Sequence, residues 1–171
     1  MNLHTEPVTL EESFKAGMQL LAATVTVVTA EHEGTRAGMA ATAVSSLTAD
    51  PPSLLICTNR TSRTYGFIMD SRKFAVNLIP DDLSEVVNAF ASKGDKEEQF
   101  LRAGSWGESQ SGVPILRDAL ASFVCRVDNW ANTKTHAVFF GLVDEVRTNP
   151  EKSPLIYVQR GFNRIVPLGE C

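Results

Sequence analysis

The first pattern along the chain is a helical one. Between Leu10 and Leu21, apolar residues recur at intervals of three or four, and Thr9 stands three residues before Glu12. A threonine and a glutamate at this spacing form a capping box, in which each side chain accepts a hydrogen bond from the other residue's backbone N–H. We therefore predict an amphipathic helix that begins directly after Thr9.

Most of the remaining pattern is typical of β-strands. Residues 24–29 consist only of valine and threonine, which favour strands, and the polar residues 31–34 that follow predict a turn. Compact or alternating apolar runs predict further strands along the chain. These are residues 54–57, 73–79, 119–130, 136–147 and 155–159.

Helices are predicted at two places between these strands. Ser62 is a suitable N-cap for a short helix that runs through Ile68. Pro80-Asp81 predicts the start of another helix, whose apolar positions continue to Phe90. The charged, glycine- and serine-containing residues 91–112 are interpreted as a surface excursion.

Composition agrees with one compact domain. The chain has 171 residues and a mass of 18.6 kDa, and 43% of its residues are hydrophobic, which is enough for one sizeable core. Roughly six strands against two or three helices predict a mainly β fold, a β-barrel with peripheral α-helices. Residues 1–171 are expected to form a single domain without internal repeats.

Charge and cysteine usage exclude several classes of protein. A formal net charge of −4 gives no basic field to attract nucleic acid or anionic lipid, and no apolar run of about 18 residues predicts a membrane span. The cysteines, Cys57, Cys125 and Cys171, form no C-x-x-C pair, which argues against a disulfide framework and a structural zinc site. We expect a soluble, reduced, cytoplasmic protein without a metal site.

A segment of small side chains is the first candidate for a ligand site. Residues 38–48 are mostly alanine, serine and threonine, with hydroxyls at positions 42, 45, 46 and 48. Small side chains would let a flat heteroaromatic ring approach the backbone, while hydroxyls and N–H groups bond its polar edge. The alternative is close packing of two sheets or two subunits, and composition leaves both open. A nucleotide would need such an architecture, because the chain has neither a G-x-G-x-x-G nor a G-K-S/T loop.

A second cluster lies at the predicted start of the helix that Ser62 caps. Residues 58–64 carry hydroxyls and two guanidinium groups beside the N–H groups that a helix N-terminus leaves without partners. The helix dipole, these donors and a bidentate arginine all favour a phosphate. A solvated, capped helix end is the alternative.

His136 is the histidine placed most like a site residue, at the entry to a predicted strand. An imidazole there would bond a ligand or position a reacting group near neutral pH, although a structural histidine gives the same pattern. Cys57 is interpreted as a small buried hydrophobe rather than a nucleophile. Near the C-terminus, Tyr157, Arg160 and Phe162 offer aromatic faces and a guanidinium for stacking on a nucleotide, with core packing as the alternative.

A series of short motifs follows in one order along nearly the whole chain. They are Phe14 to Met18, Val25 to Thr29, Gly38-Met39, Ala41 to Ser46, Asp50 to Leu54, Arg60 to Thr64, Phe74 to Asn77, Phe90-Ala91, Gln99-Phe100, Thr135-His136 and Leu155 to Tyr157. This series resembles the short-chain flavin reductases, and most closely the reductase components of two-component 4-hydroxyphenylacetate 3-monooxygenases. The resemblance implies a split β-barrel that binds FMN or FAD and uses NADH or NADPH to reduce it. It also implies a homodimer with the flavin near the subunit interface.

The resemblance also assigns roles by position. It implies that residues 42–46 line the flavin ring and ribityl chain, that residues 57–59 edge the ring, and that residues 62–64 meet the phosphate. It implies a catalytic His136 beside the nicotinamide and the flavin. The cofactor-binding set that it implies is Thr42, Ala43, Val44, Ser45, Ser46, Cys57, Thr58, Asn59, Ser62, Arg63, Thr64, Ala91, Tyr157, Arg160 and Phe162.

The implied reaction is hydride transfer from nicotinamide C4 to flavin N5, followed by delivery of reduced flavin to a partner flavin-dependent monooxygenase. The cofactors carry this chemistry, and the protein stacks the two rings. One departure from similar reductases is Lys134-Thr135 before His136, where a glycine and an aspartate or threonine are usual, so the pyridine-nucleotide preference is open. The alternative function is a non-enzymatic flavin-binding or electron-carrier protein of the same fold.

Overall fold

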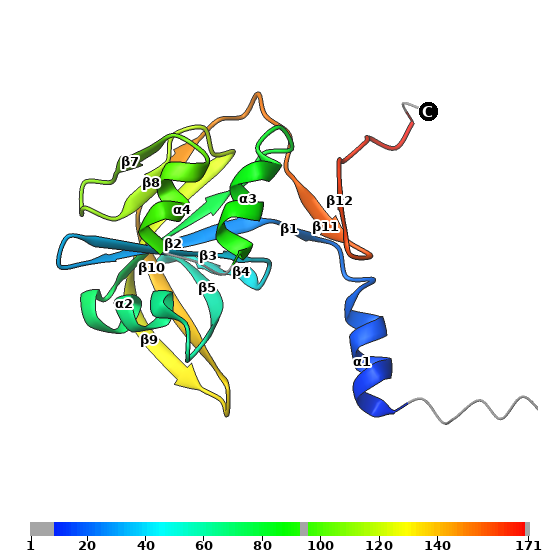
Figure 1. Ribbon diagram of the computed structural model, residues 1–171, viewed down its shortest axis with the longest axis horizontal. Helices are drawn as coiled ribbons and strands as arrows, with labels where there is room; N and C mark the ends of the chain where they lie inside the picture. Colours follow the sequence, from blue (N-terminus) through cyan, green and yellow to red (C-terminus); the bar gives the residue numbers. More distant parts are fainter. Residues whose placement is uncertain (1–8, 93–95, 170–171) are drawn as a thin grey trace, which may run out of the picture.

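The protein is described by a computed structural model, which covers residues 9–92 and 96–169 (Figure 1). Its centre is a seven-stranded sheet in which all neighbouring strands are antiparallel. The prediction of a mainly β fold is confirmed. In spatial order the strands are β3 (Thr35–Ala41), β2 (Thr26–His32), β6 (Lys73–Leu78), β9 (Ala121–Asn132), β10 (His136–Thr148), β5 (Pro52–Asn59) and β4 (Val44–Ala49).

The central strands are buried on both faces. In β2, Val27 packs in a cluster with residues of the helix α3 (Ser84–Ala91), whereas its neighbour Val28 packs in a second cluster with Ile56 and Phe74. Both valines are fully buried. Because successive side chains of a strand point to opposite faces, β2 lies between two apolar layers, and its residues 26–30 are all buried, two threonines included.

The helices lie around this sheet. The capping box predicted at Thr9 is present at the start of α1 (Leu10–Met18). Ser62 caps α2 (Arg63–Ser71), which is three residues longer than predicted. The predicted start of α3 at Pro80-Asp81 is wrong, because Pro80 forms a β-bridge with Pro154 and the Asp81 N–H donates to the Ser153 carbonyl at 2.9 Å.

Residues 91–112, predicted as a surface excursion, lie mostly at the surface but are more regular than expected; residues 93–95 of this range lie outside the described residues. The rest contain α4 (Lys96–Arg102) and β7 (Trp106–Glu108), which pairs with β8 (Pro114–Leu116). The rings of Phe90, Phe100 and Trp106 lie 4.9–5.2 Å apart between their centroids. Burial of these aromatic faces stabilises a segment whose local sequence is polar.

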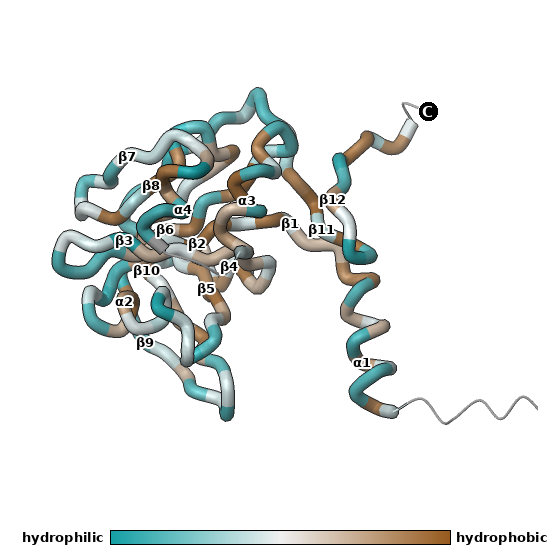
Figure 2. The backbone as a smooth tube through the Cα atoms, in the orientation of Figure 1, coloured by the Kyte–Doolittle hydropathy of each residue, from teal (hydrophilic) through white to brown (hydrophobic). Residues whose placement is uncertain are grey.

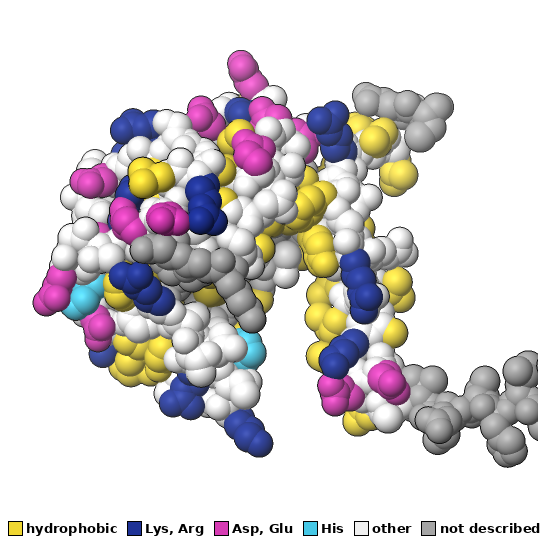
Figure 3. Space-filling view, viewed as in Figure 1, with side chains coloured by type: hydrophobic (Ala, Val, Ile, Leu, Met, Phe, Trp, Pro, Cys, Tyr) yellow, Lys and Arg dark blue, Asp and Glu magenta, His cyan; other side chains and the backbone are white. Residues whose placement is uncertain are grey.

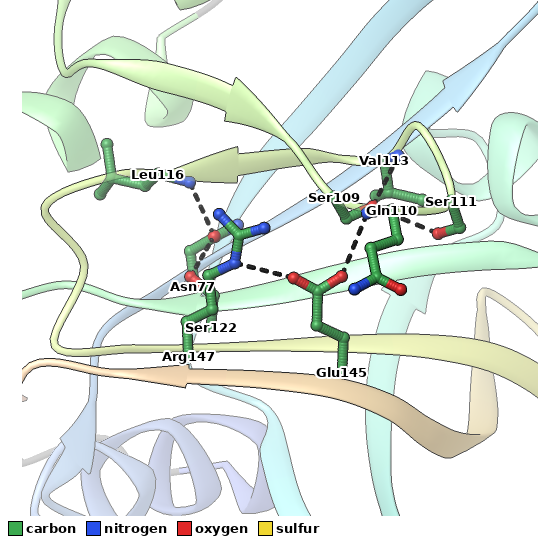
Figure 4. A network of polar contacts seen from close by, with 9 residues as sticks. All are labelled: Asn77, Ser109, Gln110, Ser111, Val113, Leu116, Ser122, Glu145 and Arg147. Carbon is green, nitrogen blue, oxygen red and sulfur yellow. Dashed lines mark hydrogen bonds and ion pairs between the residues drawn. The ribbon is translucent and has the colours of Figure 1, made fainter.

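A polar network fixes the centre of the sheet (Figure 4). The Asn77 Oδ1 atom accepts hydrogen bonds from the Leu116 N–H and the Ser122 hydroxyl, each at 2.9 Å. The Asn77 amide nitrogen donates to the Val27 carbonyl at 3.1 Å and to the Thr29 hydroxyl at 3.3 Å. One buried side chain therefore joins β2, β6, β8 and β9, and all of its hydrogen-bonding capacity is used.

An arm extends from the barrel, made of α1 and a three-stranded sheet (Figures 1 and 2). The sheet contains β1 (Ala23–Thr24), β11 (Ile156–Val158) and β12 (Gly161–Asn163), so it joins the two ends of the described chain. The prediction of an amphipathic first helix is confirmed in its start and cap, but the helix ends at Met18, so Leu21 of the predicted apolar pattern lies beyond it. However, α1 buries none of its residues in this single chain, although its apolar stripe is present.

Candidate functional site

The seven-stranded sheet is open between its two edge strands, β3 and β4, which follow each other in the sequence, and we call this opening the split. These strands form the two edges of the seven-stranded sheet, and only Thr42 and Ala43 connect them. The Val44 N–H donates to the Thr42 carbonyl at 3.0 Å, and the Cys57 N–H donates to the Ala43 carbonyl at 3.0 Å. The small-residue segment thus lies at the opening of the barrel.

An apolar cavity of about 600 Å³ adjoins this split. Five residues of the small-residue segment line it, whereas Ala43 does not; the five are Thr42, Val44, Ser45, Ser46 and Thr48. Most other walls are aliphatic or aromatic, so the cavity combines an apolar interior with hydroxyls. The remaining lining residues are Leu21, Ala22, Ala23, Thr24, Thr26, Pro52, Ser53, Leu54, Leu78, Phe123, Val143 and Val146.

The strand β5 follows the split and carries an unusual buried hydroxyl. Thr58 is fully buried, and its Oγ1 atom has no hydrogen-bond partner in the described chain. A buried hydroxyl without a partner costs free energy, about 1–3 kcal/mol for a typical group. Cys57 beside it is half-buried, so it is less enclosed than expected, and Asn59 is exposed.

The start of α2 keeps its predicted residues close together but uses them in different ways. The Ser62 hydroxyl accepts a hydrogen bond from the Tyr65 N–H at 3.1 Å and so caps the helix. The Arg63 guanidinium lies over the Phe67 ring, 5.0 Å from its centroid. Thr64 is almost fully buried, with 1% of its surface exposed. Of the three, Arg63 has the side chain that solvent reaches most easily.

His136 begins β10, opposite Asn59 of β5. A tight turn holds it, because the Thr133 hydroxyl accepts from the His136 N–H at 3.1 Å and donates to the His136 carbonyl at 2.9 Å. The Thr135 hydroxyl lies 2.8 Å from His136 Nδ1. This contact occupies one ring nitrogen and leaves Nε2 of the exposed imidazole for a ligand.

A second cavity, of about 410 Å³, lies between the start of α2 and the β9–β10 turn. The sequence pointed to residues 58–64 as a phosphate site and to Lys134-Thr135 as a departure beside His136, but it did not predict that these two segments meet at one cavity. Those residues come from loops that are far apart in sequence, so no local pattern joins them. The full lining is Asn59, Arg60, Thr61, Tyr65, Lys134 and Thr135.

Most of the predicted site residues line neither cavity in this single chain, namely Ala43, Cys57, Thr58, Ser62, Arg63, Thr64, Ala91, His136, Tyr157, Arg160 and Phe162. Tyr157 and Phe162 lie on the arm, with ring centroids 5.9 Å apart, and both are more than one-third exposed. Arg160 occupies the turn between β11 and β12, where its φ is +62°. Ala91 is the exposed last residue of α3.

Other site chemistries find little support among the described residues. They include no group of three or more His, Cys, Asp or Glu side chains arranged to hold a metal ion. In the same residues, no helix has both the length and the apolar character needed to cross a membrane. Burial, with a smaller contribution from Asp144, raises the pKa of the Cys125 thiol to about 12, so this thiol stays protonated near neutral pH.

Comparison with known proteins finds a family whose model matches most of the chain. Residues 18–166 match the model of the flavin reductase like domain. The chain is 36% identical over 155 residues to the FMN reductase (NADH) RutF 2 of Rhizobium rhizogenes, covering 91% of this chain and 89% of the relative.

Solved structures of proteins with related sequences have the same fold. A Haemophilus somnus protein assigned as a flavin reductase superposes with a TM-score of 0.87 at 32% identity, covering 92% of this chain and 100% of that one. The nitrilotriacetate monooxygenase component B from Mycobacterium thermoresistibile gives a TM-score of 0.86 at 28% identity, with 94% and 89% covered. The split barrel expected from the sequence motifs is therefore confirmed.

Proposed function

Because this chain belongs to the flavin reductase like domain family, we propose that it is an NADH-dependent FMN reductase that supplies reduced flavin to a partner oxygenase. The family relation extends over nearly all of the described chain. FAD as a second flavin and NADPH as a second hydride donor belong to the same proposal. The free thiols of Cys57 and Cys125 fit the reducing cytoplasm that we propose as its compartment.

The observation that carries this proposal is the cavity at the split. Its volume of about 600 Å³ falls within the range of roughly 300–1,000 Å³ that is usual for small-molecule sites. Thr42, Ser45 and Ser46 bring hydroxyls and backbone to an otherwise apolar wall. An isoalloxazine ring requires this combination, because it has apolar faces and a polar edge. Thr58 on the adjoining strand is fully buried and does not line this cavity, so the hydroxyls offered to a ligand there come from the small-residue segment and its neighbours.

The residues present fit a flavin mononucleotide, and we assign them as follows. Residues 42–46 would hold the ring and the ribityl chain, residues 57–59 would edge the ring, and Ser62, Arg63 and Thr64 would meet the phosphate. Ala91, Tyr157, Arg160 and Phe162 are proposed to border the pocket once a second subunit is present. A bound flavin supplies the ring that accepts the hydride of NADH.

His136 is proposed to position the nicotinamide. Its ring is fixed on one side by the Thr135 hydroxyl and exposed on the other. The protein needs no covalent nucleophile for this reaction, since its task is to hold two rings at reacting distance and to exclude water. An imidazole at the edge of the site contributes a hydrogen bond whose direction depends on the proton at Nε2.

Steady-state oxidation of NADH with added FMN tests the proposed function. We expect FMN-dependent turnover, with FAD and NADPH measured as alternative substrates. An anaerobic titration separates the reductase from a flavin carrier, since NADH bleaches the flavin absorbance only in the reductase. Absence of turnover with every pair of substrates would refute the enzymatic proposal, and a bound flavin that stays oxidised would favour the carrier.

We also propose that the protein is a homodimer in which the arm packs on a second copy. Leu10, Phe14 and Met18 of α1 are 87%, 64% and 47% exposed, and apolar residues of the C-terminal segment are similarly exposed. Hydrophobic side chains gather along this arm in Figure 3. A patch of this kind is rare on a monomer, and the cavity wall formed by residues 21–24 belongs to the same arm.

Substitution of the arm tests the dimer. We expect Phe14→Asp to raise the dimer dissociation constant by about 100-fold, because a charge replaces an aromatic anchor at the interface. Sedimentation velocity measures the change. Leu101→Asp is the matched control, since Leu101 is 78% exposed on α4 of the barrel. A dimer of unchanged strength in Phe14→Asp, or equal loss in both variants, would contradict the proposed interface.

The phosphate assignment makes a separate prediction. We expect Arg63→Ala to weaken FMN binding by about tenfold or more and to leave riboflavin binding nearly unchanged, because only FMN carries the phosphate. Fluorescence quenching of each flavin gives the two dissociation constants. Equal weakening for both ligands would show instead that loss of the contact with Phe67 had disturbed α2.

A further inference from the structure

The second cavity is built by two loops that are tied together. The Arg60 N–H donates to the Thr135 carbonyl at 3.0 Å, and its guanidinium donates to the Thr133 carbonyl at 3.3 Å. Asn59 accepts from both the N–H and the hydroxyl of Thr61 at 2.9 Å. The Arg60 bonds hold the loop before α2 against the β9–β10 turn, and the Asn59 bonds fix the shape of that loop, so the cavity between loop and turn has defined walls.

The charged side chains that line the second cavity are all cationic. Arg60 and Lys134 both line it, and no Asp or Glu stands among the lining residues. Across the described part of the chain, neither of these cations pairs with a carboxylate, although eight other ion pairs are formed. The net charge of the chain is −4, so this local excess of positive charge is not a general property of the surface. Two unpaired cations facing one cavity favour an anionic ligand with more than one charge.

The cavity also lies beside the proposed hydride-donor site. Lys134 and Thr135 directly precede His136, and Asn59 is the strand partner of His136. The Thr135 side chain contacts both features, because it lines the cavity and its hydroxyl reaches His136 Nδ1. A ligand whose ring meets His136 would therefore place a neighbouring anionic group in the cavity.

We propose that this cavity binds the pyrophosphate of the pyridine nucleotide, with Arg60 and Lys134 as its cationic contacts. The inference rests on the proposed function, because it takes a nicotinamide at His136 as its starting point. The flavin phosphate is the other phosphate available, but Ser62, Arg63 and Thr64, to which we assign it, do not line this cavity. The half-buried Tyr65 completes the wall with an aromatic edge.

Binding of ADP-ribose tests the pocket without any turnover. This probe carries the pyrophosphate but neither a nicotinamide nor a flavin. By calorimetry we expect Lys134→Gln to raise its dissociation constant about tenfold, because it removes one charge-assisted contact. Arg60→Gln is expected to raise it by at least as much, since it also loses the contact with the Thr133 carbonyl. Lys73→Gln is the matched control, since Lys73 is an exposed cation at the start of β6 outside the cavity. Undetectable binding, or affinity that is the same in all variants, would overturn the proposal.

Kinetics provide the second measurement. We expect the KM for NADH to rise about tenfold in Lys134→Gln while kcat stays nearly constant, and the rate with reduced nicotinamide riboside, which has no phosphate, to stay the same. Equal loss with both donors would overturn the proposal. A weaker binding of FMN but not of riboflavin would also overturn it, by placing the flavin phosphate here. If the chain binds ADP-ribose through Lys134 but reduces no flavin, the proposed function alone fails.

Discussion

Replacement of His136 by alanine is expected to lower kcat for NADH-dependent FMN reduction by about 100-fold. The reason is geometric, since a ring misplaced by about 1 Å at the reacting centre costs about this factor. The Thr133 and Thr135 contacts hold His136 in one orientation at the start of β10, so its loss removes a fixed hydrogen-bonding group. Rapid-mixing absorbance of the flavin under anaerobic conditions measures the effect.

His32→Ala is the control for this experiment. His32 is a partly exposed histidine at the end of β2, where it packs against Phe67 and lines neither cavity. We expect FMN affinity to change by less than about twofold in either variant, because His136 is proposed to act on the nicotinamide. An unchanged kcat in His136→Ala would refute the positioning role, and a loss of FMN affinity equal to the loss of rate would assign the residue to flavin binding.

Asn77→Leu is expected to lower the free energy of unfolding by about 3 kcal/mol or more. The substitution keeps the approximate size of the side chain but removes all of its hydrogen bonds. The buried Leu116 N–H and Ser122 hydroxyl lose their acceptor, and the Thr29 hydroxyl loses a donor. Each buried polar group left unsatisfied costs about 1–3 kcal/mol.

Urea denaturation measures this change, with Asn132→Leu as the control. Asn132 is the exposed last residue of β9, so the same substitution there is expected to alter stability by less than about 0.5 kcal/mol. A loss below about 1 kcal/mol in Asn77→Leu would show that water or a shifted backbone satisfies the groups that Asn77 leaves. The prediction would then be wrong even if the fold itself survived.

The sequence predicted correctly the helix starts that depend on hydrogen bonds between residues close in sequence. The capping box at Thr9 and the cap at Ser62 were found because each joins residues only three positions apart. The start of α3 was misplaced because a bridge from Pro80 to Pro154, far away in sequence, holds the chain extended there. The cluster of Phe90, Phe100 and Trp106 was missed for the same reason, since it joins a helix, another helix and a strand across polar loops.

The residues of the candidate site also fall into two groups: those that a local sequence pattern indicates, and those that only the folded chain brings together. The small-residue segment was visible in the sequence because its residues are adjacent, and the structure places five of its residues, between positions 42 and 48, on one cavity. The pairing of Arg60 with Lys134 was not visible, because only the register between β5 and β10 brings their loops together. The role of the arm residues in cofactor binding stays a prediction, because in a single chain no other surface covers Tyr157 and Phe162.

The Asn77 network ties together the middle of the sheet, so the edge strands are the parts of the sheet that open most easily. Asn77 lies on β6, next to the middle strand of the sheet, whereas β3 and β4 are the edges on either side of the split. β3 packs against α2, α3 and α4, but β4 has β5 as its strand partner and exposes most of its residues. Local opening costs least free energy at an edge with one paired side. We therefore expect local opening of the sheet first at β4, whose residues line the cavity at the split.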